Sequence, residues 1–434
     1  MPGPEDGTED GPEEGPEDGP EDGREDGRAE ARRLFDVAVA AADPAAALSR
    51  AFDAQPPDRP GPGGRTILIA VGKAAVPMAR TALSRLAAPV EALIVTNAEN
   101  ASPVQGARLR VTGHPVPNEA GAAAGEEVLS LLTRATTADR VVALISGGGS
   151  ALLPAPAPGL TLADKAAVNR ALLAGGLPIA EVNLIRQQLS RLKGGGFLRA
   201  AAPAPVAAYI LSDVVGDDLA AIASGPTVAP LGTRADARNL LIRRGLWDAL
   251  PQPVRTHLSA PEPQAPPLPP ARNLLIGSNR LSLQAMAAAH PGAILADAPL
   301  EGDVSEAAER IILAAKEAPP GACLIFGGET VVTLKGKGLG GRNQELALRV
   351  ALAAGRIGRP FVFLSGGTDG RDGPTEAAGG IVDDQSGARM RAAGIDAQAR
   401  LADNDSNPAL AASGDLLMTG GTGTNVADVQ VLIL

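Results

Sequence analysis

Several apolar runs in this chain stop abruptly in glycine, serine, threonine and aspartate, which are residue types that bind anions and metal ions. The clearest case reads LSGGTDGRDGPT over residues 364–375 and follows the apolar residues 361–363. A strand with this ending presents backbone N–H groups and carboxylates at the carboxyl end of a sheet, where α/β proteins bind their ligands. The stretch therefore predicts a ligand-binding loop.

Glycine-rich strand ends recur along the chain. They lie at residues 146–150 (SGGGS), 193–196 (KGGG), 327–330 (GGET), 365–370 (SGGTDG) and 420–423 (GGTG). Glycine permits the close approach and the positive φ that backbone N–H groups need in order to surround an anion. Any one of these stretches could be a plain turn, but together they predict a site for a phosphate-type ligand.

Aspartates in the loops after strands supply a second kind of ligand. Asp213 and Asp369 come directly after apolar runs, and Asp217 and Asp372 stand a few residues further on. Because Mg²⁺ takes few protein carboxylates and borrows phosphate oxygens, two or three well-placed aspartates suffice for it. Turn and cap chemistry is the alternative, equally strong for Asp217 and Asp372, whereas Asp213 and Asp369 favour a functional role.

Two cations stand where an anionic ligand would explain them. Lys73 follows the buried-strand run TILIAV, where a solvated lysine is unexpected. Arg342 follows two glycines at a predicted helix start, where the helix dipole disfavours a cation unless an anion is near. Lys193 precedes three glycines and is equally consistent with a surface position.

Standard catalytic and nucleotide motifs are weak or missing. The sequence contains no P-loop, and Gly336, Gly338 and Gly341 match G-x-G-x-x-G without an acidic residue about 20 positions later. No Ser-His-Asp or Cys-His arrangement is evident, because Cys323 heads an apolar run and is predicted to lie in the core.

Alternating strands and helices must position these loops. Apolar runs predict strands at 66–71, 91–96, 140–145, 206–211, 273–276, 293–296, 323–326, 330–334, 361–364 and 426–434, with helical periodicity between most of them. This alternation predicts an α/β fold of two three-layer αβα domains with mostly parallel sheets. Prolines crowd residues 251–271 and predict a stiff linker, which sets an N-terminal domain at 29–250 and a C-terminal domain at 272–434.

The N-terminal residues 1–28 are predicted to be a disordered acidic tail. Residues 4–27 repeat the pattern x-E-[D/E]-G six times and hold most of the negative charge of a chain whose net charge is −10. Repeats without an apolar residue other than proline cannot bury a surface. Binding of a basic partner by this tail is the alternative to a purely solvating role.

Composition narrows the function classes. The 434 residues are 45% hydrophobic, enough for two or three cores, and only 2% aromatic, which gives no support for nucleic-acid binding. No apolar run approaches the roughly 18 residues of a membrane span, and a single cysteine excludes an internal disulfide. We expect a soluble, cytoplasmic protein.

Taken in order, the motifs resemble the class II glycerate 2-kinases, a family whose C-terminal part is called MOFRL. They are VGKAA (71–75), GHPVP (113–117), ISGGGSALL (145–153), LSRLKGG (189–195), LSDVVGD (211–217), ASGPT (223–227), GGET (327–330), GGRNQE (340–345), SGGTDGRDGPT (365–375) and GTGTNV (421–426). The resemblance spans residues 29–434, so 29–250 resembles a Rossmann-like glycerate kinase domain and 272–434 a MOFRL domain.

The resemblance implies ATP- and Mg²⁺-dependent phosphorylation of D-glycerate at its 2-hydroxyl, in a cleft between two domains. Carried over by motif, the catalytic residues are Lys73, Asp213, Arg342 and Asp369, with Asp213 and Asp369 also as metal ligands. The residues implied for substrate or nucleotide binding are Ser146, Gly147, Gly148, Gly149, Ser150, Lys193, Glu329, Asn343 and Asn425. A homodimer is compatible with this assignment.

Two departures from the family pattern concern turn stiffness more than charge. Gly421 stands where the family usually has proline, and Asn118 replaces a common aspartate. Nucleotide affinity is the property that they would affect.

Two other functions stay open at this point. The family has also carried the label hydroxypyruvate reductase, which the G-x-G-x-x-G match would suit, although a ribose-binding acid and an obvious proton donor are missing. The other is a non-enzymatic module that binds phosphorylated metabolites. Carboxylates at the strand ends argue against it, because anion binding alone does not place aspartate beside phosphate without a metal.

Overall fold

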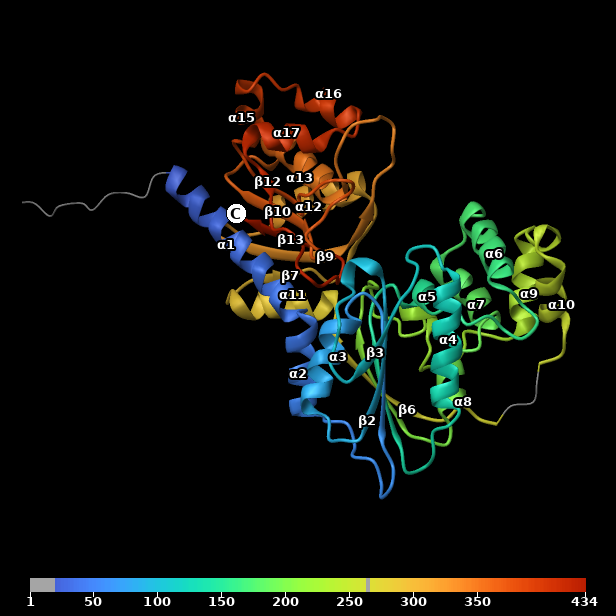
Figure 1. The fold of residues 1–434 in the computed structure, drawn as a ribbon. Coiled ribbons are helices and arrows are strands. Elements are labelled where there is room, and N and C mark those ends of the chain that lie inside the picture. The colour runs from blue at the N-terminus through green and yellow to red at the C-terminus, as the bar shows by residue number, and fades with distance from the viewer. Residues whose placement is uncertain (1–19, 263–265) are drawn as a thin grey trace, which may run out of the picture.

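The computed structural model describes residues 20–262 and 266–434, which form two halves, each built on a sheet (Figure 1). The first sheet contains six parallel strands in the order β3-β2-β1-β4-β5-β6. They are β1 (Thr66–Val71), β2 (Val90–Thr96), β3 (Ala107–Val111), β4 (Arg140–Ile145), β5 (Val206–Leu211) and β6 (Ala271–Gly277). The order reverses between β1 and β4, and ligands of doubly wound sheets bind outside the carboxyl ends of strands at such a point.

Both faces of the first sheet are covered, which confirms the three-layer prediction for this half. Alternate residues of the buried strand β1 enter separate cores, Ile67 and Ile69 on one face and Leu68 and Ala70 on the other. The first core is closed by α4 (Glu119–Leu132), α5 (Gly149–Leu152) and α8 (Gly196–Ala201), and the second by α2 (Pro44–Ala54) and α3 (Ala75–Arg85).

A group of helices beside α4 has an apolar core of its own. The helices are α6 (Leu162–Ala174), α7 (Ile179–Gln188), α9 (Arg234–Arg243) and α10 (Gln252–Ser259), at the right of Figure 1. Thr161 and Thr233 start α6 and α9 with capping boxes. Helix α10 occupies residues predicted as linker. Proline is tolerated there because it stands in the first turn, whose N–H groups need no helical partner.

The second sheet is mixed rather than mostly parallel. Its order is β12-β11-β10-β13-β9-β7, with β8 also paired to β9. The strands are β7 (Ile294–Leu295), β8 (Leu300–Asp303), β9 (Cys323–Val331), β10 (Val362–Gly367), β11 (Gly379–Asp383), β12 (Leu416–Leu417) and β13 (Asp428–Ile433). Strand β13 runs antiparallel to β9 and β10, and β10 antiparallel to β11. The prediction of parallel strands is wrong here, because no helix joins β10 to β11, and parallel neighbours need a long crossover.

Helices also cover both faces of the second sheet. One face is packed against α12 (Val304–Glu317) and α13 (Arg342–Leu352), and the other against α1 (Pro20–Ala41) and α11 (Asn279–Ala289). The shorter elements are α14 (Ala354–Ile357), α15 (Ser386–Ala392), α16 (Ala397–Ala402), α17 (Ser406–Ser413) and 3₁₀ turns at Ala98–Asn100, Ile222–Ser224 and Trp247–Ala249.

The halves do not follow the predicted domain boundaries. Strand β6 pairs with β5, so the residues after 271 complete the first sheet instead of opening the second half. Helix α1, at the other end of the chain, packs on the second sheet, as Figure 1 shows. The chain therefore crosses between the halves at the α1–α2 junction and again at the β6–α11 junction.

The predicted acidic tail is wrong for residues 20–28, which are helical, while residues 1–19 lie outside the described residues. Helix α1 is anchored by apolar residues at helical spacing, Leu34, Phe35 and Ala38, and by charge. Arg28 donates to Asp383 and Asp415 at 2.6 and 2.9 Å. The acidic repeats by themselves have no apolar surface to bury. Arg24 and Arg28, however, form ion pairs with Asp384 and Asp383 of the second half.

None of the helices in the described residues combines the length and apolar character needed to span a membrane.

Candidate functional site

The carboxyl ends of β1, β4 and β5 bring three predicted residues, Lys73, Ser146 and Asp213, to one edge of the first sheet. The backbone N–H of Lys73 donates to the carbonyl of Gly147 at 2.9 Å, and that of Ala74 donates to Ser146 Oγ at 3.1 Å. These bonds tie the turn after β1 to the turn after β4. Ser146 is buried and acts as a link between the turns.

The glycines after β4 leave room for the side chains of Asp213, His114 and Lys73. A Cβ atom on Gly147 would fall 2.1 Å from Asp213 Oδ2. One on Gly148, whose φ is 84°, would stand 3.1 Å from His114 Nε2 and 3.4 Å from Lys73 Cγ. Glycine is therefore needed here because side chains crowd the backbone, a reason that the sequence did not disclose.

Asp213 has the electrostatics of a proton acceptor. Burial raises the pKa of its carboxyl group, while its own backbone N–H and the charge of Lys73 oppose part of that shift. Burial also lowers the pKa of the neighbouring His114, and Lys73 lowers it further. A carboxylate whose pKa moves toward the working pH is suited to general base chemistry.

In the second half, a buried carboxylate fixes Arg342. Its Nε and Nη2 donate to the two oxygens of Asp428 at 2.6 and 2.9 Å, and Nη1 lies 3.0 Å from Glu329 Oε1. The side chain of Asp428 is 1% exposed and that of Arg342 is 34% exposed. Burial works against the charge of Arg342, but Asp428 and Glu329 outweigh it and raise its pKa. The guanidinium is thus oriented before any ligand arrives.

Asp369 lies at the same edge of the second sheet as Arg342. Gly367, the last residue of β10, is paired in register with Asp428, and a Cβ on Gly367 would stand 3.2 Å from Asp369 Oδ1. Asp369 Oδ1 accepts a hydrogen bond from the backbone N–H of Arg371 at 3.1 Å. The half-buried carboxylate therefore has further lone pairs for a ligand.

Other predicted residues of this half are engaged within the protein. Asp372 caps α13, because its oxygens accept from the backbone N–H groups of Asn343 and Gln344 at 3.1 and 2.8 Å. Asn343 is buried and accepts from Ser365 Oγ at 2.6 Å. Asn425 accepts from the backbone of Ala427 at 3.1 Å. Cap chemistry explains Asp372, and the side chain of Asn343 lies beneath the surface.

The two edges meet where the halves join. Val426 packs in the core cluster that contains Ala74, the neighbour of Lys73. Asn279, the first residue of α11, donates from Nδ2 to the carbonyls of Val426 and Asp428 at 2.9 and 2.8 Å. The structure thus brings the Lys73–Asp213 edge and the Arg342–Asp428 edge to one junction. No hydrogen bond or ion pair within residues 20–262 and 266–434 joins the two groups directly.

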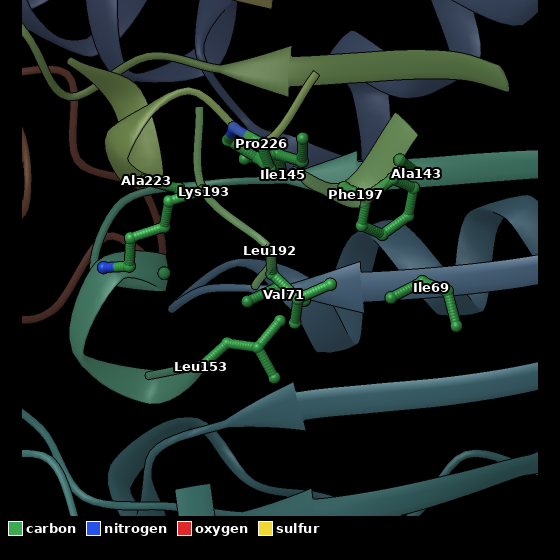
Figure 2. Close-up of a pocket in the computed structure, with 11 residues that line it drawn as sticks. Ile69, Val71, Ala143, Ile145, Leu153, Leu192, Lys193, Phe197, Ala223 and Pro226 are labelled. Atoms are coloured by element: carbon green, nitrogen blue, oxygen red, sulfur yellow. The ribbon is translucent and has the colours of Figure 1, made fainter. Parts of the chain in front are cut away.

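Lys193 is an interior cation, so a surface position for it is wrong. Its Nζ donates to the carbonyl of Ser150 at 2.8 Å and contacts Ser150 Oγ. Figure 2 shows the Lys193 side chain reaching away from a small cavity lined by apolar residues such as Val71 and Leu153. Burial lowers the pKa of Lys193 well below its ordinary value, and the charges of Lys165 and Arg186 lower it further.

Ser150 continues into a chain of hydroxyl groups. Ser150 Oγ lies 3.0 Å from Ser224 Oγ, which bonds to Asn183 Oδ1 at 2.9 Å. Ala223 and Ser224 have φ values of 50° and 61°, in the left-handed region that such residues rarely adopt. Strain of this kind is retained where surrounding contacts impose it, and it clusters at functional sites.

The G-x-G-x-x-G match does not form a dinucleotide loop. Its backbone N–H groups are occupied: that of Gly336 donates to Asn404 Oδ1 at 3.0 Å and that of Gly338 to the carbonyl of Asp403 at 2.9 Å. A Cβ on Gly341 would fall 2.4 Å from Cγ of Asp372. Carboxylates and a side-chain amide therefore fill the space that a pyrophosphate would need.

Sequence reasoning missed two groups of residues at the site. Asp428 had a detectable signal, because a carboxylate that opens a buried strand needs a partner. Lys165 and Arg186 had none, since charged residues in helical segments usually face solvent.

Asn118, one of the two departures from the family pattern, caps α4 by accepting a hydrogen bond from the backbone N–H of Gly121 at 3.0 Å. That replacement keeps the cap that an aspartate would form.

Comparison with known proteins shows which families and relatives the chain resembles. Residues 30–259 match a domain of unknown function (DUF4147), and residues 322–428 match the MOFRL family. The chain is 41% identical over 427 residues to a protein of Agrobacterium vitis with the provisional name hydroxypyruvate reductase, covering 93% of both. It is 40% identical over 386 residues to the D-glycerate 2-kinase of Thermotoga maritima, covering 85% of this chain and 90% of that one.

A solved structure extends the likeness to three dimensions. The crystal structure of a glycerate kinase from Thermotoga maritima matches with a TM-score of 0.86 at 36% identity. The match covers 94% of this chain and 100% of that one.

Proposed function

We propose a phosphoryl-transfer function from one premise: the chain belongs to the family of glycerate 2-kinases that carry a C-terminal MOFRL domain. It transfers the γ-phosphoryl group of ATP to the 2-hydroxyl of D-glycerate and releases 2-phosphoglycerate and ADP. The observation that supports the proposal is the junction of the halves: Val426 packs in the core cluster of Ala74, the neighbour of Lys73, and Asn279 bonds to the backbone of Asp428, the partner of Arg342.

Each residue at the junction has a task in this reaction. Phosphoryl transfer depends on positioning and charge neutralisation more than on covalent chemistry. Asp213 accepts the proton of the 2-hydroxyl as the new O–P bond forms and the bond to the bridging oxygen of ADP breaks. Lys73 neutralises the moving phosphoryl group, and Arg342 binds the carboxylate of glycerate.

Carboxylates on both halves of the chain are suited to Mg²⁺. This ion takes oxygen ligands, and it commonly binds one or two carboxylates together with substrate phosphates. Asp369 keeps free lone pairs, and Asp217 Oδ1 is buried without a hydrogen-bond partner among the described residues. When bound, Mg²⁺ would neutralise charge on the phosphate oxygens. No group of three or more His, Cys, Asp or Glu side chains in the described part of the chain forms a metal site, and none is needed.

An oxidoreductase is the second candidate, because one relative carries the provisional name hydroxypyruvate reductase. Its support in this sequence was the G-x-G-x-x-G match, whose loop is filled by Asp403 and Asn404. The kinase assignment is therefore preferred.

A product assay tests this choice. With ATP, Mg²⁺ and D-glycerate, we expect 2-phosphoglycerate, identified by ³¹P NMR and by direct conversion with enolase, and its loss when EDTA removes the metal. NADH oxidation with hydroxypyruvate, measured in parallel, should stay at the background rate. Oxidation of NADH without a phosphorylated product would reject the kinase, and 3-phosphoglycerate would reject the position of transfer.

A further inference from the structure

We propose that the cavity between α5, α6 and α7 is the nucleotide site, in which Lys165, Arg170, Arg186 and Lys193 hold the phosphates and an apolar wall holds the base. This inference rests on the proposed function, because it assigns the phosphoryl donor of that reaction to the first half of the molecule.

The cavity has the size for a nucleotide. Its volume is about 490 Å³, and residues of the first half line it. Pockets for ligands of drug size span roughly 300–1,000 Å³. A three-carbon acid would leave most of this space unfilled, so the cavity fits the larger of the two substrates.

The cations of the cavity have no protein counter-ion in the part of the chain that the structure describes. Lys165 Nζ donates to the carbonyls of Pro154 and Leu189 at 2.8 and 3.1 Å, and Arg186 Nε donates to Asn169 Oδ1 at 3.1 Å. Among residues 20–262 and 266–434, no Asp or Glu lines the cavity. In contrast to Arg191, which pairs with Glu126, none of the four cations forms an ion pair with a carboxylate in the described chain.

Clustered cations without an acid call for an anion. Burial lowers the pKa of Lys165 to about 7, and the charge of Arg186 adds to the shift. The same repulsion acts on Lys193. A polyphosphate would neutralise these positive charges and remove the repulsion between them, whereas a single carboxylate would leave most of the repulsion in place.

Another part of the cavity lining is apolar and open to solvent. It includes Pro115, Val116 and Pro117 from the GHPVP stretch, with Leu173 from α6. Val116 and Leu173 are 71% and 65% exposed. Exposed apolar side chains at the rim of a cationic cavity fit a ligand with one flat apolar end and one anionic end, which is the chemistry of a nucleotide.

The cavity also reaches the catalytic edge. His114 and Gly148 belong to its lining. Gly148 adjoins Lys73, and its neighbour Gly147 lies against Asp213. A nucleotide in this cavity therefore lies next to the edge that carries Lys73 and Asp213.

Direct binding of ADP in the absence of glycerate tests the assignment. Using the full chain and isothermal titration calorimetry, we expect Arg170→Gln and Arg186→Gln each to raise the Kd of ADP by about 10-fold or more. Arg170 is exposed and forms no ion pair among the described residues, so its replacement leaves folding intact. AMP should bind more weakly than ADP and lose less affinity in both variants.

A matched control removes an arginine outside the cavity. Arg134 is exposed and contacts Ser130 on α4, so Arg134→Gln should change the Kd of ADP by less than about twofold. If the wild type binds ADP and the cavity variants bind it equally well, this site assignment is wrong and the kinase function stands. A raised KM for glycerate with unchanged ADP affinity would give the cavity to the acid instead. A wild type without affinity for ADP would reject the proposed function itself.

Proton uptake gives a second readout. A lysine with a pKa of about 7 is mostly neutral at pH 8 and mostly charged at pH 6, and a nearby phosphate favours its charged form. The groups of the same cavity are Arg170, Arg186, Lys193 and His114. Binding of ADP should therefore take up protons at pH 8 and fewer at pH 6, as buffers of different ionisation enthalpy reveal. Lys165→Met should reduce the uptake. No uptake at pH 8 by the wild type would contradict a phosphate beside Lys165.

Discussion

Replacing Asp213 by asparagine should lower kcat by roughly 10²–10⁴-fold while the KM values for ATP and glycerate change little. Asparagine has nearly the same shape but cannot take the proton of the 2-hydroxyl. The carboxylate of Asp213 lies against Gly147, and burial raises the pKa of Asp213. We therefore expect the substitution to slow the chemical step rather than to weaken substrate binding. Initial rates with both substrates varied measure it, with circular dichroism to show that the fold is intact.

The pH profile of the Asp213→Asn variant separates a base from a metal ligand. In the wild type, activity falls as pH decreases through the pKa of Asp213, which burial moves above its ordinary value. The variant should lack that acid limb, and added Mg²⁺ should not restore the rate. Asp218→Asn, an exposed position of the same loop, serves as control and should keep the wild-type profile. Recovery at high Mg²⁺ would make Asp213 a metal ligand instead.

The first half of the fold was predictable because buried parallel strands appear in a sequence as continuous apolar runs. The run TILIAV is buried along its whole length in β1 and is followed at once by the turn that carries Lys73, a residue of the candidate site. The second half was harder, since the direction of β13 depends on the loop before it rather than on its own residues. Helix α1 shows the same limit: its apolar residues indicate a helix, but nothing local indicates that the C-terminal half covers them.

The site was predictable where a residue directly ends a strand and hidden where a helix supplies it. Lys73 and Asp213 follow β1 and β5, so the topology alone brings them together. Lys165 and Arg186 come from α6 and α7, and their meeting depends on how those helices pack. The role of glycine was also only half predicted. Gly147 makes room for a carboxylate, a demand that arises from tertiary contacts.

Arg342→Ala should lower kcat/KM by about 10²-fold or more, because it removes the cation that binds the carboxylate of glycerate, and each hydrogen bond between charged groups is worth about 1.5–3 kcal/mol. The same change should also destabilise the protein. It leaves Asp428 buried without its partner, and breaking a buried ion pair costs about 3–5 kcal/mol. Urea denaturation measures the loss of stability, and steady-state kinetics on the folded protein measure the loss of kcat/KM. A single variant therefore mixes two effects.

The double variant Arg342→Ala with Asp428→Ala separates them. Removing both members of the pair leaves no uncompensated charge, so much of the lost stability should return, while kcat/KM should stay as low as in Arg342→Ala. Arg342→Lys adds a graded control, because lysine keeps the charge but cannot reproduce the bidentate contact to Asp428 or the third contact to Glu329. If turnover returned together with stability in the double variant, Arg342 would be a structural residue only. If activity stays lost in a stable protein, Asp428 is the residue that positions Arg342, and Arg342 is the group that meets the substrate.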